Sequence, residues 1–191
     1  MKASDKTFRV LVPGVFDLLN VGHYQYILQA KQLFKNSEII IGIMDPEQEY
    51  KYVGLTAMTH FERTENIKHI RNVDEVISPC PWILTPEFLS KNRIDVVVDN
   101  QFFPEFKFYT EIFGEVEKIG KLRKMKKMEV PKSSEYLRRI LVDVDLYMIR
   151  SIERGYKLED LGIAVWKYKY LQVRCYLKKF LGKWCLKRKE A

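Results

Sequence analysis

Short runs rich in apolar, β-forming residues alternate with stretches of helical periodicity along the first hundred positions of the chain. These runs, each a predicted β-strand, lie at 8–12, 39–43, 73–77 and 94–98, and the run at 39–43 is continuously apolar. Apolar residues recur every three or four positions at 24–34 and 60–70, and Thr85-Pro86-Glu87 is typical of the start of a helix. This alternation predicts an α/β fold with a parallel sheet.

The C-terminal third is predicted to be helical. Ser133 and Ser134 would cap a long helix that runs to about Arg154 and ends at Gly155. A second helical pattern covers 164–189, where Lys and Arg lie largely off a stripe of apolar residues: Trp166, Tyr170, Val173, Leu177, Phe180, Leu181 and Trp184. We therefore expect an α/β domain at 1–156 followed by a basic amphipathic helical tail at 157–191.

Composition excludes several classes of protein. The 191 residues are 47% hydrophobic and 30% charged, as in an ordinary globular protein, and no apolar run is long enough to span a membrane. Residues 1–7 are polar and show no secretory signal. The three cysteines, Cys80, Cys175 and Cys185, form no C-x-x-C pair, which argues against a disulfide or zinc framework. We expect a cytoplasmic protein with reduced thiols and no metal site of its own.

Positive charge is concentrated in the tail. The formal net charge is +8, and residues 157–191 hold ten Lys or Arg against three Asp or Glu, which favours a polyanionic partner. Aromatic residues flanked by cations indicate peripheral contact of 164–189 with an anionic membrane surface, while packing on the domain or on a second subunit is the alternative. We expect no nucleic-acid binding, because no recognition motif is present. A second basic run at 118–132 either binds an anion or is a solvated loop.

The turn after the first predicted strand is the first candidate site, because ligands of open parallel sheets bind beyond the carboxyl ends of the strands. Gly14 and Gly22 permit close approach of the backbone. The helix that begins near Gly22 directs its N-terminus toward this turn, which suits a phosphate. His23 either donates to a phosphoryl oxygen or is a solvent-exposed side chain in a capped turn.

Residues 14–23 resemble the nucleotidyltransferase signature G-x-F-D-x-x-H-x-G-H. Further segments resemble CTP:phosphocholine cytidylyltransferases: 71–76 (R-Y-V-D-E-V in that family), 81–89 (P-W-T-L-T-P-E-F-L), 142–147 (R-D-Y-D-V-Y) and 153–156 (Q-R-G-Y). The resemblance covers about residues 7–163 in order. It implies a Rossmann-like nucleotidyltransferase domain with a nucleotide site at Gly14, Phe16, Asp17, Gly22 and His23.

The resemblance also implies a reaction. The family joins CTP and phosphocholine to give CDP-choline and pyrophosphate, by in-line attack on the α-phosphorus. No resident cofactor is implied; CTP would be a substrate or ligand, and Mg²⁺ would be needed if the chain is active. Such catalysis depends on positioning and on neutralising phosphate charge, so a few cationic and donor side chains decide the outcome.

Those side chains are where this sequence departs from the family. Asn20 replaces the first histidine of the signature, and asparagine cannot become cationic. Val53 replaces the lysine of F-K-G-F-T-V-M, with Lys51 two residues earlier as a substitute. In the segment that resembles R-T-E-G-I-S-T, Lys127 stands for the arginine and Val130 for the glycine.

Two further positions bear on catalysis. His23 keeps the second histidine of the signature, so it joins Lys127 and the degenerate Asn20 as a catalytic candidate. The family's H-D-D triplet becomes Val98-Asp99-Asn100, which removes another histidine and one carboxylate. We therefore expect weak or absent catalysis, with Lys51 or Lys126 as the cations that could compensate.

The residues that would bind choline differ less from the family than those that would bind the phosphates. A quaternary ammonium binds an aromatic cage with a carboxylate, and Trp82 and Asp99 match family positions for that task. Phe103 stands where the family has a tyrosine. Phe113 takes the place of a second tyrosine, with Tyr109 as the alternative if the loop shifts. The other interpretation is that this aromatic segment is a hydrophobic loop that packs on the body.

Two functions remain open. One is a noncatalytic or regulatory protein of CDP-choline biosynthesis, and the other is an active enzyme that converts CTP and phosphocholine, or phosphoethanolamine, to CDP-choline, or CDP-ethanolamine, and pyrophosphate. The replacements at Asn20 and Val53 favour the first. Residues 71–76 resemble an element at a twofold interface in the family, so we expect a homodimer or a heterodimer with an active cytidylyltransferase.

Overall fold

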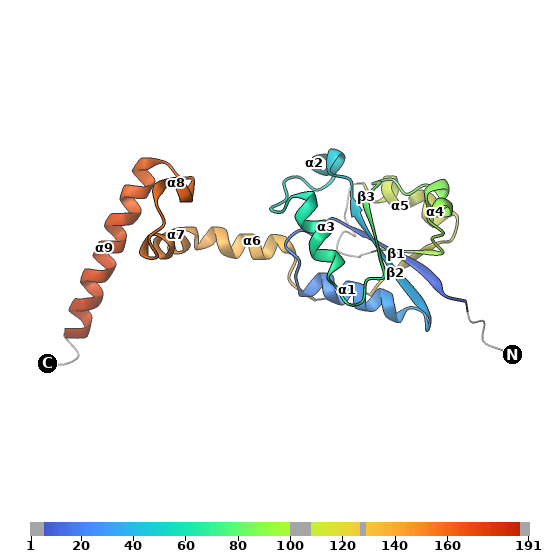
Figure 1. Ribbon diagram of the computed structural model, residues 1–191, viewed down its shortest axis with the longest axis horizontal. Helices are drawn as coiled ribbons and strands as arrows, with labels where there is room; N and C mark the ends of the chain where they lie inside the picture. Colours follow the sequence, from blue (N-terminus) through green and yellow to red (C-terminus); the bar gives the residue numbers. More distant parts are fainter. Residues whose placement is uncertain (1–5, 100–107, 127–128, 188–191) are drawn as a thin grey trace. The chain divides into compact units, whose positions relative to one another are not determined.

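Parallel strands form a sheet in the N-terminal part of the chain (Figure 1). The computed structural model describes residues 6–99, 108–126 and 129–187, except for the side chains of 178, 179 and 181–187. The strands are β1 (Phe8–Gly14), β2 (Ser37–Met44), β3 (Glu75–Cys80), β4 (Val96–Asp99) and β5 (Leu122–Lys124). All pairings are parallel and the order is β3-β2-β1-β4-β5, which confirms the predicted α/β fold.

Helices cover both faces of this sheet (Figure 1). On one face, α1 (Val21–Gln32) and α3 (His60–Lys68) pack against side chains of β1 and β2. On the opposite face, α4 (Pro86–Lys91) and α5 (Tyr109–Lys118) pack against the alternate residues of the same strands. Leu11 pairs in register with Ile40 and Val97, and all three are fully buried. The central strands β1, β2 and β4 contain continuous apolar runs because both of their faces are covered.

The direction of the strand order reverses at β1. The chain passes from β1 through α1 to β2 on one side, whereas β4 pairs with β1 on the other side. In open parallel sheets, ligands bind in the crevice beyond the carboxyl ends of the two strands at such a reversal. Those ends are Gly14 of β1 and Asp99 of β4, so the crevice beyond them is the candidate site.

Side-chain hydrogen bonds define where the helices begin. Thr59 caps α3 in a capping box: its side chain accepts from the Glu62 N–H, and the Glu62 carboxylate accepts from the Thr59 N–H. Thr85 caps α4 with Pro86 in the first turn, as predicted. A 3₁₀ turn, η1 (Pro46–Gln48), and the one-turn helix α2 (Glu49–Tyr52) lie between β2 and α3.

The sequence analysis does not predict α5 or β5. The helix α5 has a local signal, because Ile112, Phe113 and Val116 recur at helical spacing. The strand β5 has three residues, and two of them, Arg123 and Lys124, are exposed cations, so no apolar run marks it. The strand predicted at 73–77 is instead β3, which begins at Glu75. Asp74 is excluded from the ladder because its carboxylate accepts from the Ile39 N–H at 2.7 Å.

The helix predicted from Ser133 to about Arg154 is two helices, α6 (Ser133–Val142) and α7 (Val144–Glu153). Asp143 lies between them with φ −107° and ψ 20°, outside the helical region. Aspartate favours caps over helix interiors, which is the physical reason for a division at this position. Gly155 has φ 93° and follows the last residues of α7, in agreement with the predicted stop.

Internal contacts divide the chain into Met1–Ser133 and Ser134–Ala191, whereas the sequence analysis places the boundary after residue 156. The second unit also contains α8 (Leu158–Leu161) and α9 (Val165–Lys187). Its small core joins Ile149 of α7 to Leu171 and Cys175 of α9. Because α7 packs on α9, it belongs with the tail in this structure.

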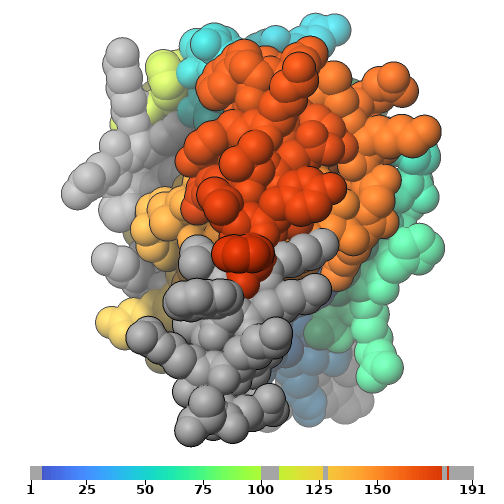
Figure 2. Space-filling view, turned by 90° about the vertical axis from the view of Figure 1, so that its left-hand side faces the viewer, coloured from blue at the N-terminus to red at the C-terminus, as the bar shows by residue number. Residues whose placement is uncertain are grey.

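Several apolar side chains of α9 are open to solvent; Figure 2 shows this helix in orange-red in a space-filling view. Five members of the predicted stripe are more than half exposed: Trp166, Tyr170, Val173, Leu177 and Phe180. This stripe is therefore separate from the α7 contact. Among the described helices, none has the length and apolar character needed to cross a bilayer.

The strand β3 forms one edge of the sheet and contains Pro79. Proline has no N–H to donate to a ladder, so within sheets it is found at edges, at strand starts or at bulges. The pairing of β3 with β2 is irregular between Gly42 and Met44. The proline thus lies where the local structure tolerates it.

Candidate functional site

The loop between β1 and α1 holds two non-glycine residues in the left-handed region of backbone conformation. Phe16 has φ 56° and Leu18 has φ 46°, a strained conformation that clusters at functional loops. The buried Phe16 ring lies over Gly14, where an added Cβ would be 2.8 Å from the ring atom Cε2. Gly14 and Phe16, both predicted site residues, therefore shape this loop by packing on each other.

Asn20 and His23 form a capping box at the start of α1. The Asn20 side-chain oxygen accepts from the Gly22 N–H at 2.9 Å, and the Asn20 N–H donates to Nδ1 of His23 at 3.1 Å. Neutral His23 therefore carries its proton on Nε2. Burial lowers the pKa of His23 to about 4, although the charge of Asp17 acts in the opposite direction. His23 is thus a neutral donor at pH 7.

The amide of Asn20 also connects α1 to a distant segment. Its Nδ2 donates to the Leu18 carbonyl at 2.9 Å and to the Ser133 hydroxyl at 3.1 Å. The Ser133 hydroxyl donates in turn to the Asp17 carbonyl at 2.7 Å. Sequence reasoning assigned Ser133 only to a helix cap, because its partners lie 113 and 116 positions away. These bonds fasten Ser133 to the β1–α1 loop within the first unit.

Val130 lies against the N-terminus of α1. A Cβ added to Gly22 would be 3.1 Å from Cγ2 of Val130 and 3.5 Å from the Pro131 carbonyl oxygen. Gly22 therefore permits the close approach of this segment, as the sequence predicts for a glycine here. The Val130 side chain fills space beside the helix N-terminus that a glycine at position 130 would leave open.

Asp17 joins the β1–α1 loop to the loop at 53–59. Its two carboxylate oxygens accept from the N–H groups of Ala57 and Met58, each at 2.9 Å, and the side chain is buried. Both oxygens of this predicted nucleotide-site residue are thus engaged within the chain. The carboxylate positions the second loop beside the first.

Lys51, Lys126 and Lys127 are the lysines that the sequence analysis offers for contact with the phosphates. Val53 follows α2 and adds no charge, whereas Lys51 of α2 pairs with Glu111 of α5, with 2.7 Å between Nζ and Oε1. Lys126 is exposed, and Lys127 lies outside the described residues. Asn20 and His23, the two signature positions at the α1 N-terminus, are therefore neutral donors rather than cations.

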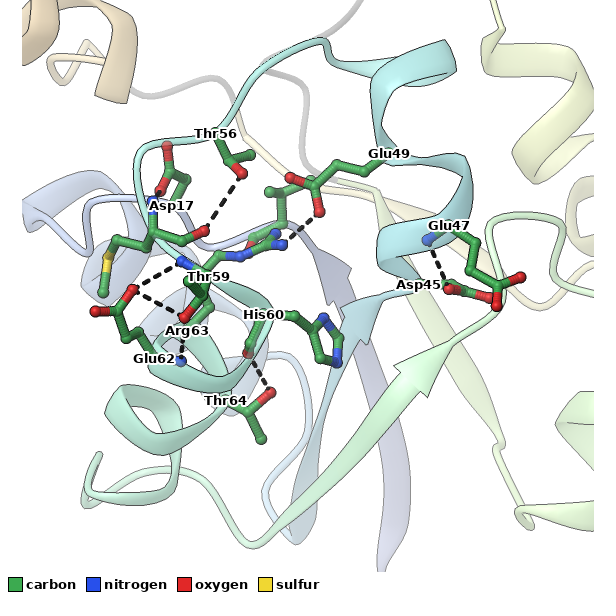
Figure 3. A network of polar contacts seen from close by, with 12 residues as sticks. Asp17, Asp45, Glu47, Glu49, Thr56, Thr59, His60, Glu62, Arg63 and Thr64 are labelled. Atoms are coloured by element: carbon green, nitrogen blue, oxygen red, sulfur yellow. Dashed lines mark hydrogen bonds and ion pairs between the residues drawn. The ribbon is translucent and has the colours of Figure 1, made fainter.

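A buried ion pair lies beside the 53–59 loop (Figure 3). Arg63 of α3 is 1% exposed, pairs with Glu49 of α2 through Nη2, and donates from Nη1 to the Val15 carbonyl at 3.1 Å. Within the described residues its Nε has no hydrogen-bond partner. Sequence reasoning missed this role, although Arg63 shares the apolar face of its helix with Ile67, which is a signal for a buried charge.

Three residues considered for the predicted ammonium cage contact one another in the structure. The Asp99 carboxylate accepts from the Tyr109 hydroxyl at 2.8 Å, and the Tyr109 ring centroid lies 5.3 Å from that of Phe113. Burial raises the pKa of Asp99, while the hydrogen bond from Tyr109 opposes this shift. Phe103 lies outside the described residues. Asp99, Tyr109 and Phe113 are therefore brought together.

Trp82 packs with a different partner. Its indole N–H donates to the Asp45 carbonyl at 2.8 Å, and its ring stacks on Tyr52 at 4.4 Å between centroids. The side chain is 4% exposed. One face of the ring is thus covered by Tyr52. Tyr52 was not singled out by the sequence reasoning.

The described residues contain no group of three or more His, Cys, Asp or Glu side chains that could hold a metal ion. The carboxylates of Asp17 and Asp99, which lie near the ends of the central strands, are engaged by N–H and O–H donors of the chain. These side chains therefore do not by themselves fit a Mg²⁺ site.

Known proteins share this sequence pattern. The model of a protein family described as cytidylyltransferase-like matches residues 11–151. Choline-phosphate cytidylyltransferase 2 of Arabidopsis thaliana is 37% identical over 183 residues, which are 95% of this chain and 60% of that protein. Choline-phosphate cytidylyltransferase A of Homo sapiens is 33% identical over 160 residues, 84% of this chain and 44% of that protein. Choline-phosphate cytidylyltransferase of Saccharomyces cerevisiae is 30% identical over 177 residues, 93% of this chain and 42% of that protein. The chain spans 42–60% of the length of these relatives.

Proposed function

Because the chain belongs to the cytidylyltransferase-like family, we propose that it acts in phosphatidylcholine synthesis as a choline-phosphate cytidylyltransferase-like protein with weak or absent catalysis. It binds CTP at the N-terminus of α1 and serves as a noncatalytic or regulatory partner of an active relative. Similarity to choline-phosphate cytidylyltransferases over most of the chain supports the pathway.

The observation that carries this proposal is the neutrality of Asn20 and His23 at the N-terminus of α1. The side-chain oxygen of Asn20 and both hydrogens of its Nδ2 are used in bonds within the chain, and His23 stays uncharged at neutral pH. Displacement at a triphosphate develops negative charge that fixed cations and donors must stabilise. Loss of one such donor typically lowers the rate by about 10² to 10³, so weak catalysis is the expected result.

Ligand binding is less affected than catalysis. A helix N-terminus attracts phosphate through its free N–H groups and its dipole, and α1 provides one next to the Nε2–H of His23. Because the described side chains do not form a Mg²⁺ site, any Mg²⁺ would be bound mainly by the triphosphate itself. CTP is therefore proposed as a ligand of this end of the sheet.

An active cytidylyltransferase is the alternative. The group formed by Asp99, Tyr109 and Phe113 favours it, because a carboxylate with aromatic rings suits the ammonium group of phosphocholine or phosphoethanolamine. In that case Lys127 would supply the cation at the phosphates.

Two measurements on the purified chain separate these functions. With CTP, Mg²⁺ and phosphocholine, we expect CDP-choline formation far below the usual turnover of about 1–10³ s⁻¹, while calorimetry detects CTP binding. Turnover in the usual range would overturn the noncatalytic proposal in favour of the enzyme. His23→Ala should weaken CTP binding, whereas His69→Ala, at the exposed end of α3, should not. Absence of CTP binding by the parent chain would overturn the ligand role.

The proposal includes two further partners. A second copy or an active relative would pair at 71–76, where Arg71 is exposed and edge strand β3 follows. An anionic membrane surface would contact 164–189 peripherally through the exposed stripe of α9. Sedimentation that shows only monomer at micromolar concentration, with and without an active relative, would overturn the proposed dimers.

A further inference from the structure

The ammonium group of Lys51 lies against two aromatic rings and a carboxylate. Its Nζ is 4.4 Å from the centroid of the Tyr52 ring and 5.5 Å from that of Phe108. It also donates to Oε1 of Glu111 at 2.7 Å and to the Tyr52 hydroxyl at 3.0 Å. Ring faces combined with an anion are the groups that recognise organic ammonium ions.

Contacts other than those of Lys51 hold these rings in place. Tyr52 is 5% exposed, stacks on Trp82 with an interplanar angle of 19°, and meets the Phe108 ring edge-on at 82°. The Tyr52 hydroxyl donates to Oε1 of Glu111 at 2.8 Å. The arrangement therefore does not depend on the lysine, and a site that is preformed binds its ligand at a lower entropic cost.

Solvent reaches the position of the ammonium group. The side chains of Lys51 and Glu111 are 51% and 37% exposed. A small solute can therefore approach the place that Nζ occupies. Because Lys51 adjoins Tyr52 in sequence, it also competes with any such solute as a tethered ligand.

We propose that Tyr52, Phe108 and Glu111 form a binding site for a small primary alkylammonium ion and that Lys51 is its internal occupant. This site uses residues other than those of the cage expected at Trp82, Asp99, Phe103 and Phe113. Tyr52, Phe108 and Glu111 are not among the residues assigned to the nucleotide, so the site goes beyond the proposed function.

The hydrogen bonds decide in favour of a primary ammonium. Lys51 makes two of them, to Glu111 and to the Tyr52 hydroxyl, in addition to its ring contacts. A primary ammonium has three N–H donors and reproduces both bonds. A quaternary ammonium has none and keeps only the ring contacts and the charge attraction.

Titration of the full chain with ethylammonium chloride, at constant ionic strength set by sodium chloride, tests the site. Lys51→Ala removes the tethered competitor, so its Kd for ethylammonium should be about tenfold lower than that of the parent, given the millimolar effective concentration of a short tether. Lys51→Arg keeps a cation and should bind as the parent does. Lys68→Ala removes another exposed lysine, paired with Glu65 at 2.6 Å, and should change nothing.

A second substitution and a second probe complete the test. Adding Glu111→Gln to Lys51→Ala should abolish the gain, and tetramethylammonium should bind Lys51→Ala more weakly than ethylammonium does. Circular dichroism that matches the parent spectrum establishes that each variant is folded. An unchanged Kd in Lys51→Ala, an equal gain in Lys51→Arg, or equal or tighter binding of tetramethylammonium would overturn the proposal.

Discussion

At the residue scale, the side chain of Asn20 makes hydrogen bonds to Gly22, Leu18 and Ser133 among the described residues. An imidazole has only two ring nitrogens, so a histidine at this position could not make all three. Asparagine is also among the best N-cap residues. The residue that replaces a histidine of the family signature thus stabilises the loop–helix junction but provides no cation.

Restoring two family residues should raise the catalytic rate. Asn20→His together with Val53→Lys is expected to raise CDP-choline formation more than the two single changes combined, because both positions would act on the same phosphates. Asn20→His should also cost about 1 kcal/mol of stability through the lost cap. Initial rates and urea unfolding of all four proteins check this. A double variant that is no faster than the parent would contradict it.

The lowered pKa of His23 should make the free energy of unfolding depend on pH. The unfolded chain binds a proton at this imidazole near its ordinary pKa of 6.5, but the folded chain does so only near 4. Between these values the unfolded state holds more protons, so the free energy of unfolding falls as the pH falls from 6.5 to 4.

Urea unfolding at several pH values measures this loss. His23→Gln should show a smaller decrease across the same window, whereas His69→Gln, at an exposed position, should follow the parent. His60, whose pKa burial also lowers, is present in all three proteins and so does not affect the comparison. Parallel pH curves for His23→Gln and the parent would exclude His23 as the source.

At the scale of elements, one buried arginine connects three parts of the first unit. Arg63 comes from α3, its partner Glu49 from α2, and the carbonyl of Val15 from the loop after β1. Asp17 adds the 53–59 loop through the N–H groups of Ala57 and Met58. The two loops beside the candidate site are therefore positioned by buried charges of the chain itself.

Removing one member of this ion pair should be costly. Arg63→Ala leaves Glu49 buried without its partner and should lower the free energy of unfolding by about 3–5 kcal/mol. The double variant Arg63→Met with Glu49→Leu should recover much of that loss, because apolar residues need no partner. Lys68→Ala, which breaks an exposed pair, should cost less than about 1 kcal/mol. Equal effects of Arg63→Ala and Lys68→Ala in urea unfolding would contradict this view.

The sequence predicted those elements whose signals are local. The strands β1, β2 and β4 contain continuous apolar runs because they are buried on both faces, and Thr85 marks its helix by its own cap. The short strand β5 carries exposed cations, so it forms because β4 offers an open edge, which no local pattern records. Asp143 divides a helix whose apolar stripe runs through the division.

In the candidate site, too, the residues with a local sequence signal could be predicted and those without one could not. Gly14, Gly22 and His23 could be found because they lie together in one turn after a strand. Ser133 could not, since its contacts with Asp17 and Asn20 exist only after the chain has folded. The positions of side chains such as Lys51 likewise depend on which of several long-range partners the fold brings close.

At the scale of the whole molecule, the chain consists of two units that bury separate cores. The first has apolar cores on both faces of its sheet, and the second has the small core of Ile149, Leu171 and Cys175. The positive charge lies mainly in the second unit. Folding of the sheet and contact with an anionic surface can therefore be tested separately.

A chain that ends at Tyr156 should keep its folded sheet but lose binding to anionic vesicles. Each cation near an anionic surface contributes on the order of 1 kcal/mol, and the exposed apolar stripe adds to this. Added salt should weaken binding of the full chain. Vesicle sedimentation compares the two proteins, with neutral vesicles as the control. Equal binding would place the membrane contact outside α9, and unfolding of the shorter chain would show that α9 supports the fold.

Pro79 limits the addition of further strands to the edge of the sheet that β3 forms. Open edges are templates on which further chains can add strands, and repeated addition is the route to cross-β fibrils. An outward ladder on β3 cannot run through Pro79, because that residue has no N–H to donate. Growth by repeated strand addition is therefore blocked within a few residues, while pairing at the preceding residues stays possible. Concentrated solutions of the folded protein should consequently remain free of fibrils that bind thioflavin.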